Sequence, residues 1–528
     1  MTKQGRKPDG DEWSRMWASA SFVGVLIIIG LPLWWKTTEV YRVSLPYDKI
    51  NFFDGEALML STDLTVLAND EPTASEIAGL IEKDFEEQKV IKLNIKKLII
   101  SDQLRHSLDS VADEAEALEE VAAHYDISKH NTFFVVQRKP LYEDVWLSGE
   151  RVAFFRDAKA SPTLVEVLKQ WVYQTDILEG ARSATTDSAR RSRFPPASGY
   201  HVVLSVVHPR PDSMKVEFDA GQAMEDYIGS FVDELSELHN FTLSSQWLYL
   251  LDFDFQAKEV KDTSEWGRHF AVRQDKLHLL LTKLEERAAT QVSALPTINL
   301  ALYVLPCERA PLAVYDEQDR RIPTPVQAFM SPKWGGVYLG NPEASECQGT
   351  PEYRPTVRLI MGTFIAQLRK LLGITDKPTI PGAFLDPLRA VPPRRWELDS
   401  LLALRTLEQL ASSQGTLRSL AQLLGEISNI VINDEVGVSI NAAVAAIEDG
   451  AARLASGELL SAHRSSQRAH SAAETAFMEP SLLALLYFPD DQKYAIYIPL
   501  FLPIMFPVIL SLKNLLFWLR GKPKEKVD

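Results

Sequence analysis

Two long uncharged stretches, one near each end, constrain this 528-residue chain more than any other feature. The first covers residues 17–35 and the second covers residues 494–512, and both are rich in aliphatic and aromatic side chains. A helix of roughly 20 apolar residues crosses the hydrocarbon core of a bilayer. We therefore expect transmembrane helices at 16–36 and 494–513, followed outwards by short tails at 1–15 and 514–528.

The charges beside these stretches indicate their orientation. Residues 1–15 contain four basic and three acidic side chains, and residues 513–528 contain five basic and two acidic ones. By the positive-inside rule, both termini are expected in the cytosol and the body between the spans in the lumen. Pro32, Trp34, Trp35 and Lys36 follow the first apolar core where a signal peptide would need small residues, so an uncleaved anchor is favoured.

Particular residues within the two stretches are candidates for contacts inside the membrane. Ala20 and Gly24 form a small-xxx-small pair, which permits close approach of another helix. Pro499, Pro503 and Pro507 recur at every fourth position and share one helical face. Each proline frees a carbonyl one turn earlier. The second helix is therefore either kinked with local adjustments, or packed on this face against other membrane helices.

The first part of the body, residues 37–390, alternates strand-like and helix-like patterns. This alternation predicts an α/β domain in which flanking helices cover a mixed sheet. Thr73 and Glu76 are predicted to form a capping box at the start of the first of these helices. The expected strands are 63–68, 132–137, 152–156, 201–208, 247–255 and 298–305, and the expected helices are 77–85, 107–124, 164–178, 221–238 and 275–288.

The pattern changes twice towards the C-terminus. Residues 306–355 are rich in proline and are predicted to be mostly loop. After a second break at 378–393, residues 391–493 are predicted to form a helical region leading into the second span. Its apolar stripes predict four helices, over 398–410, 417–431, 440–454 and 458–477, and these stripes are interpreted as core.

The sequence offers few groups for chemistry. The chain has two cysteines, Cys307 and Cys347, which form either a disulfide or two buried thiols. Asn240 begins the sequon Asn240-Phe241-Thr242 and is a glycosylation candidate if the body is lumenal. The net charge of −15 argues against nucleic acid as a partner.

No catalytic, metal or cofactor motif is present in the sequence. It contains no G-x-S-x-G, H-E-x-x-H, P-loop or G-x-G-x-x-G pattern. A Cys–His nucleophile is conceivable but no pair is singled out. Asp252 and Asp254 alternate on an expected strand and are interpreted as part of a solvated face. His463 and His470 are likewise interpreted as solvent-facing, and no cofactor is expected.

Several long segments of the chain are distinctive enough to be compared with known families. Residues 30–47 carry GLPLWWKTTEVYRVSLPY, which resembles the amino-terminal part of the PIG-S family, a subunit of the glycosylphosphatidylinositol (GPI) transamidase. The resemblance continues through SPKWGG, AQLR and SLAQLLGEISNIVI, and ends with LLYFPDDQK and IYIPLFLP near the second span. These segments lie at 331–336, 366–369, 419–432, 485–493 and 496–503.

The resemblance implies a non-catalytic subunit in the membrane of the endoplasmic reticulum. Its complex would cleave a carboxyl-terminal signal from a proprotein and join the new carbonyl to the ethanolamine of a GPI lipid. The implied partners are PIG-K, which would carry the nucleophile, together with PIG-T, PIG-U and GPAA1-type subunits, and also the proprotein and the GPI lipid. Two alternatives stay open, namely a lumenal cargo-binding receptor or adaptor and an independent lumenal hydrolase.

Overall fold

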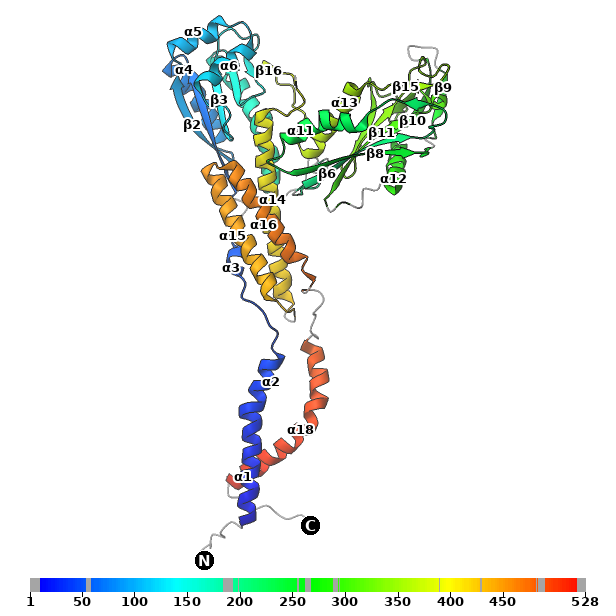
Figure 1. The fold of residues 1–528 in the computed structure, drawn as a ribbon. Coiled ribbons are helices and arrows are strands. Elements are labelled where there is room, and N and C mark those ends of the chain that lie inside the picture. The colour runs from blue at the N-terminus through cyan, green and yellow to red at the C-terminus, as the bar shows by residue number, and fades with distance from the viewer. Residues whose placement is uncertain are drawn as a thin grey trace, which may run out of the picture. The chain divides into compact units, whose positions relative to one another are not determined.

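The computed structural model describes residues 10–519 except 54–57, 184–192, 198, 254–255, 262–266, 288–292, 294, 389, 428–429, 481 and 483–489. Two compact units can be distinguished. The first lies within Met1–Phe52, Gly415–Val444 and Ser471–Asp528, and the second within Phe53–Gln414 and Ala445–His470. Figure 1 shows the elements of each unit by label and colour.

A six-stranded mixed sheet forms the N-terminal part of the second unit. Parallel pairings join β2 to β1, β1 to β3 and β3 to β5, whereas β4 runs antiparallel to β5. The strand order is β16 (Ala383–Leu385), β4 (Val145–Leu147), β5 (Val152–Phe155), β3 (Thr132–Gln137), β1 (Leu60–Ala68) and β2 (Ile91–Ile99).

Helices cover both faces of this sheet. On one face, α5 (Asp102–Ser110) and α6 (Glu114–His124) pack with Phe134 in an apolar cluster. On the other face, Phe133 contacts Tyr173, whose ring also contacts Phe85. The elements on that second face are α4 (Glu71–Phe85), α7 (Ser161–Val167) and the π-helix η4 (Leu168–Tyr173), followed by α8 (Thr175–Arg182).

A second, five-stranded sheet follows along the chain. Its strands β14, β11, β6 and β8 are parallel, and β13 is antiparallel to β14. The strand order is β13 (Gln327–Ser331), β14 (Gly335–Gly340), β11 (Thr297–Val304), β6 (Gly199–His208) and β8 (Asn240–Tyr249). Strand β8 is therefore an edge strand, whereas β6 and β11 are central and almost wholly buried.

This second sheet is also covered on both faces. Helix α12 (His278–Arg287) buries Leu280 and Leu284 against one face, and α13 (Val357–Leu372) places Phe364 against Tyr338 on the other. Short elements surround the sheet: α10 (Ala220–Ala223), η5 (Met224–Gly229), α11 (Ser230–Asp233), β7 (Lys215–Val216), β9 (Lys258–Lys261), β10 (Arg268–Arg273), η6 (Gln274–Lys276), η8 (Cys307–Arg309), β12 (Leu312–Tyr315) and β15 (Glu352–Tyr353).

Three long helices make up the helical region, namely α14 (Arg395–Glu426), α15 (Asp434–Ser456) and α16 (Leu459–Phe477). Each has part of its length in each compact unit. Gly450 of α15 permits a close approach to Leu410 of α14, since a Cβ on this glycine would lie 3.0 Å from the leucine side chain. Gly457, with φ +82°, makes the turn between α15 and α16.

The first unit contains the apolar helices of both chain ends. The N-terminal path consists of α1 (Gly10–Val25), the π-helix η1 (Leu26–Gly30) and α2 (Leu31–Thr38). Within it, Met16–Lys36 is long and apolar enough to cross a membrane. The C-terminal helix α18 (Asp490–Leu519) contains the three prolines, and its apolar stretch Phe501–Lys513 is shorter than a span requires. The second span therefore stays a prediction.

Segments far apart in sequence meet inside the first unit. Trp34 of α2 contacts Tyr497 and Phe501 of α18, with ring centroids 5.9 and 5.5 Å apart. The segment after α2 runs beside residues preceding α15, because Arg42 forms a β-bridge with Ile432. Beyond this bridge lies the short helix α3 (Tyr47–Asn51).

Most of the expected strands are confirmed, but one is displaced. Strands β1, β3, β5, β6 and β11 match the expected segments within a few residues. The strand expected at 247–255 is wrong in its bounds, since β8 begins at Asn240 and ends at Tyr249. Its first half, NFTLSS, contains only two apolar residues, which are too few to predict a strand. Strand β2 was not expected, because its lysines and exposed positions belong to an edge strand.

The capping box expected at Thr73 and Glu76 is wrong. Helix α4 begins earlier, with Asp70 as its N-cap, and the Asp70 side chain accepts a hydrogen bond from the backbone N–H of Thr73 at 2.9 Å. Pro72 lies in the first turn, where its missing N–H has no consequence. Thr73 is therefore inside the helix rather than at its boundary.

Two expected helices are interrupted. The helix expected at 107–124 is divided into α5 and α6, because the buried guanidinium of Arg138 donates to the carbonyls of Leu108 and Val111 at the end of α5. The helix expected at 164–178 is broken at Gln174, which has φ +49°. The Gln174 side chain bonds to Thr375 and Ser400, and these contacts fix the break.

The loop expected at 306–355 is only partly correct. It contains β12, β13 and β14, and β14 is fully buried inside the five-stranded sheet. Three of the six residues in its sequence GGVYLG are glycines, which are depleted in strands. By contrast, the helical prediction for the last third is confirmed by α14, α15 and α16, although α14 joins the first two expected helices into one.

Candidate functional site

The predicted intramembrane residues lie on surfaces that the chain itself leaves open. A Cβ added to Gly24 would meet no heavy atom within 4 Å, and Ala20 is half-buried. Pro499, Pro503 and Pro507 are exposed on α18. These residues are therefore available to other molecules, and their role in helix contacts stays a prediction.

Asn240 occupies the first position of the edge strand β8 and is exposed. Thr242 of the same sequon is exposed as well. Nothing in the described residues covers this end of the strand, which pairs on one side only, with β6. The sequon is thus sterically open to modification.

The candidates for chemistry are engaged in other roles. Cys307 and Cys347 form a disulfide, with Cα atoms 5.7 Å apart, so neither sulfur is available as a thiolate. Asp252 follows β8 and accepts from Arg309 at 2.9 Å, with Arg210 at 3.5 Å. Asp254, its predicted partner, lies outside the described residues.

The interpretation of His463 as solvent-facing is wrong. This residue is fully buried, and its ring nitrogens lie 3.2 Å from both the hydroxyl of Thr406 and the carbonyl of Leu238. Burial lowers the pKa of His463, so the ring is neutral. His470 is half-buried. Within the part of the chain that the structure describes, no cluster of three or more metal-ligating side chains is present.

A polar cavity of about 440 Å³ brings three parts of the second unit together. One wall comes from the loops before β3 and β5, and contains His130 and Arg151. A second comes from the segment after α11, with Glu237, and a third from the first turn of α14. We call this cavity and its polar side chains the junction. It connects the two larger sheets through one helix.

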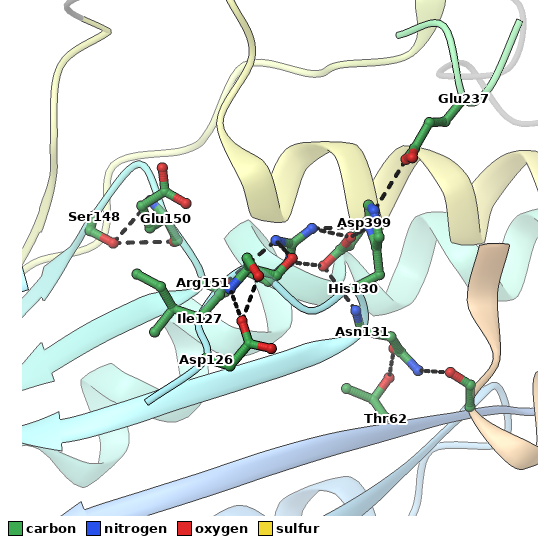
Figure 2. A network of polar contacts seen from close by, with 12 residues as sticks. Thr62, Asp126, Ile127, His130, Asn131, Ser148, Glu150, Arg151, Glu237 and Asp399 are labelled. Atoms are coloured by element: carbon green, nitrogen blue, oxygen red, sulfur yellow. Dashed lines mark hydrogen bonds and ion pairs between the residues drawn. The ribbon is translucent and has the colours of Figure 1, made fainter. Parts of the chain in front are cut away.

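Asp399 of α14 is the centre of the junction (Figure 2). Its carboxylate accepts from Arg151 Nε at 2.6 Å and Nη2 at 2.8 Å, which is a bidentate ion pair. The same carboxylate lies 2.7 Å from His130 Nδ1 and accepts the backbone N–H of Asn131 at 3.1 Å. On the other side of the ring, His130 Nε2 lies 3.1 Å from Glu237.

Two ionisable groups of the junction, His130 and Asp399, shift one another's pKa values towards their charged forms. The hydrogen bond to Asp399 raises the pKa of His130, although burial acts in the opposite direction. Burial would raise the pKa of Asp399, but the hydrogen bonds from Arg151 and His130 hold it below its ordinary value. The carboxylates of Asp399 and Glu237 thus favour the protonated form of His130, whereas the guanidinium of Arg151, 3.0 Å from the same Nδ1, opposes it. Arg151, only 1% exposed, is paired with Asp399.

This arrangement of charges suits a structural role rather than a catalytic one. A general-base histidine needs one free nitrogen towards a nucleophile. Both ring nitrogens of His130 are occupied by carboxylates. The serine nearest in sequence, Ser128, donates its hydroxyl to Asp126 at 2.5 Å. The junction therefore acts as an ionic clamp between loops, sheet and helix.

Asn131 extends this clamp to the helical region. Its side chain donates to the carbonyls of Ser61 at 2.7 Å and Gly457 at 3.0 Å, and accepts from Thr62 at 2.6 Å. Asn131 has φ +59°, a conformation that asparagine tolerates better than most residues. One buried amide thus connects β1 to the turn between α15 and α16.

Comparison with known proteins decides the family. The family model described as "Phosphatidylinositol-glycan biosynthesis class S protein" matches residues 21–522. The chain is 32% identical to the GPI-anchor transamidase component PIGS of Bos taurus and 33% identical to the proteins of that name from Rattus norvegicus and Homo sapiens. Each of these alignments covers 97% of both chains. The chain belongs to the PIG-S family.

The segments that suggested the PIG-S family have structural roles. SPKWGG at 331–336 makes the tight connection between β13 and β14, and AQLR at 366–369 lies on α13. Tyr41, from the N-terminal segment, donates its hydroxyl to Asp434 at 3.0 Å. The neighbouring Arg42 binds the Leu424 carbonyl within the segment at 419–432.

The sequence of this PIG-S family member gave no indication of the junction. Arg151 and Asp399 are 248 positions apart, and His130 and Asp399 are 269 apart. Neither spacing nor periodicity connects such residues. The available signals are weak: two polar residues, His130 and Asn131, directly before the buried strand β3, and an aspartate, Asp399, in the first turns of α14.

The stability contributed by His130 is expected to depend on pH. Because its pKa is raised in the folded state, the contribution is complete below the reference value of 6.5 and is lost as pH rises through the folded pKa. The difference in Tm between the wild type and His130→Gln should therefore shrink as pH rises above about 6.5. His124→Gln, at an exposed position of α6, is the control and should show no such trend. An unchanging difference would contradict the charged state of His130.

Proposed function

We propose that this chain is a subunit of the GPI transamidase complex and supports the attachment of GPI anchors to proprotein carboxyl termini. The observation that carries this proposal is full-length membership of the PIG-S family, with relatives named as GPI-anchor transamidase components. Similarity over 97% of both chains leaves no large part of this chain to a different function.

Within the complex we assign the chain a non-catalytic, organising role. Support comes from the engagement of its best candidates for chemistry. The two cysteines are joined to each other, and His130 is held between Asp399 and Glu237. A clamp that fixes two sheets against a long helix suits a body whose surface must be presented to other subunits in one geometry.

The proposed location is the membrane of the endoplasmic reticulum, with two spans, cytosolic termini and a lumenal body. Met16–Lys36 is suited to the first span. The basic excess of both tails supports cytosolic termini. A disulfide between Cys307 and Cys347 is compatible with the oxidising lumen, and the exposed sequon at Asn240 can be reached by lumenal enzymes.

Glycosylation of Asn240 is the expected consequence of this topology. The full chain made in microsomes should migrate faster after glycosidase treatment, and Asn240→Gln should abolish the shift. Ser245→Asn, which creates no sequon because Trp247 occupies the third position, is the matched control on the same strand. Digestion of the body by protease added outside sealed microsomes would contradict the lumenal placement.

The proposed partners are PIG-K, PIG-T, PIG-U and GPAA1-type subunits, with the proprotein and the GPI lipid as further candidates. A tagged full chain co-expressed with these subunits should recover them, and transamidation should fail when the chain is omitted. Recovery of cargo proteins without PIG-K would instead indicate a receptor or adaptor. Turnover by the chain alone, abolished by Asp252→Asn, would indicate a hydrolase.

The contacts within the membrane can be tested separately. Gly24→Leu adds bulk where the chain itself has open space, so the body should fold normally while helices of partners are excluded. Recovery of the other subunits should fall several-fold. Ile28→Leu is the control. Ile28 is 74% exposed on the same helical path, and leucine has the same volume as isoleucine. Equal recovery with Gly24→Leu would remove Gly24 from the contact candidates.

A further inference from the structure

A second cavity, of about 630 Å³, lies between α13 and the start of α14 and is lined by an excess of cations. Arg369 comes from the last turn of α13, Lys377 from the loop that follows, and Arg394 from the residue preceding α14. The carboxylate buried beside them is that of Glu397. The group therefore carries a formal net charge of +2 inside a chain whose total charge is −15.

Glu397 cannot satisfy all three cations. Its oxygens accept from Arg369 Nη2 at 2.8 and 2.9 Å and from Arg394 Nη1 at 3.1 Å. The second terminal nitrogen of Arg369, Nη1, is buried without a hydrogen-bond partner. Glu397 is 2% exposed, so water contributes little to balancing the charges.

Among the residues that the structure describes, none forms an ion pair or a hydrogen bond with the amine of Lys377. Nζ is buried and unpartnered, and lies 5.4 Å from the ring centroid of Trp396. Burial lowers the pKa of Lys377 to about 8; Glu397 opposes this change, and the charges of Arg369 and Arg394 add to it. A buried cation without a partner is costly, and an anion in the cavity would relieve that cost.

The remaining wall of the cavity is apolar. It is formed by aliphatic side chains of α13, of the loop after it and of the segment following β16, namely Ile365, Ile374, Leu385, Leu388 and Val391. Two further charged residues line the rim. Arg358 is exposed, and the exposed Asp376 is already paired with Lys370 at 2.7 Å.

We infer that this cavity is a binding site for a phosphate monoester, with the phosphate among Arg369, Lys377 and Arg394 and the organic part against the aliphatic wall. A phosphate monoester carries about −1.5 to −2 charges, which matches the net charge of the group, whereas a carboxylate carries only −1. Its three terminal oxygens can accept from the free Nη1 of Arg369 and from Nζ of Lys377. The volume exceeds that of phosphate alone and suits a small organic ester.

The test uses the full chain in detergent, with its co-purified subunits, at constant ionic strength. Binding of inorganic phosphate, n-butyl phosphate and acetate is measured by calorimetry and by the ligand-induced rise in Tm. We expect n-butyl phosphate to bind more tightly than inorganic phosphate, and acetate to bind weakest. Tighter binding of inorganic phosphate than of n-butyl phosphate would overturn the assignment of an ester. Acetate binding as tightly as the phosphates would overturn the assignment of a phosphate site. If none of the three compounds bound, the site itself would be rejected.

Lys377→Met locates the binding. Loss of one charge-assisted contact should weaken n-butyl phosphate binding by at least about tenfold. Because its amine has no partner, this replacement should not lower the Tm measured without ligand. Lys370→Met is the matched control: Lys370 lies one residue from Arg369 and is absent from the cavity wall. Wild-type affinity in a folded Lys377→Met protein, or equal loss in both variants, would overturn the assignment.

Discussion

Replacing Asp399 with alanine is expected to lower the free energy of unfolding by about 3–5 kcal/mol, the usual cost of removing one partner from a buried ion pair. Arg151, which is 1% exposed, would lose both hydrogen bonds of the bidentate pair. His130 and the backbone N–H of Asn131 would lose their acceptor as well. The loss is large because one carboxylate accepts hydrogen bonds from three groups that belong to two separate loops.

Thermal unfolding of the full chain and limited proteolysis should both report the change. Asp399→Ala should lower the Tm and expose the segments before β3 and β5 to protease. Asp376→Ala is the control, since the carboxylate of Asp376 is 79% exposed and its ion pair is worth less than about 1 kcal/mol. An unchanged Tm for Asp399→Ala would mean that the junction does not contribute to the stability of the fold.

Acid should reproduce part of this effect in the wild type. The folded-state pKa of Asp399 is lowered, so its contribution is complete above the ordinary aspartate range and is lost as pH falls through the folded value. His130 titrates in the opposite sense, because its pKa is raised. The junction is consequently most stable in the interval between these two transitions.

Periodicity predicted those parts of the fold in which local pattern and burial agree. Strands such as β3 and β11 are continuous apolar runs in central positions, and the stripes of α14 and α15 lie inside the helical region. The prediction failed where tertiary contacts override the local pattern. Gln174 breaks a helical pattern because its side chain is held by Thr375 and Ser400.

The candidate site depends on contacts that no local pattern contains. In the junction, Arg151 binds Asp399, which lies 248 residues later in the sequence. The phosphate site depends on Lys377, which directly precedes the break at 378–393 and belongs to no predicted helix or strand. The resemblance to the PIG-S family indicated more than periodicity did, since Arg42 binds the carbonyl of Leu424 and the Tyr41 carbonyl accepts from the backbone N–H of Ile432, both in another segment that suggested the family. It did not reveal the physical reason for these contacts.

The sequence GGVYLG of β14 illustrates why composition misled the prediction. Gly335 has φ +139°, and a Cβ there would lie 1.8 Å from the carbonyl oxygen of Asn299. A Cβ on Gly336 would lie 1.9 Å from the side chain of Gln367, which donates to the Phe329 carbonyl. Both positions require glycine because a neighbouring strand and α13 approach so closely. Glycine is typical of loops, but here it is required for a buried strand to form.

Gly335→Ala is therefore expected to destabilise the chain by about 2–6 kcal/mol, combining a strained backbone conformation with a steric clash. The clash is with the backbone of β11, which cannot move without breaking the pairing Asn299↔Gly335 and those beside it. Gly336→Ala should cost less, because the conflicting atoms belong to a side chain. The measurements are the Tm and the protease sensitivity of the full chain.

Gly79→Ala separates this clash from the general effect of adding a methyl group. Gly79 lies in α4, where a Cβ would meet nothing within 4 Å, so alanine should stabilise the helix by about 0.5–1 kcal/mol. We therefore expect Gly335→Ala to lower the free energy of unfolding and Gly79→Ala to raise it. If Gly335→Ala were as stable as the wild type, β14 could not lie in its described register against β11. The buried strand assigned to Gly335–Gly340 would then have to be rejected, because its pairing and the tight turn at 331–336 depend on the same glycine.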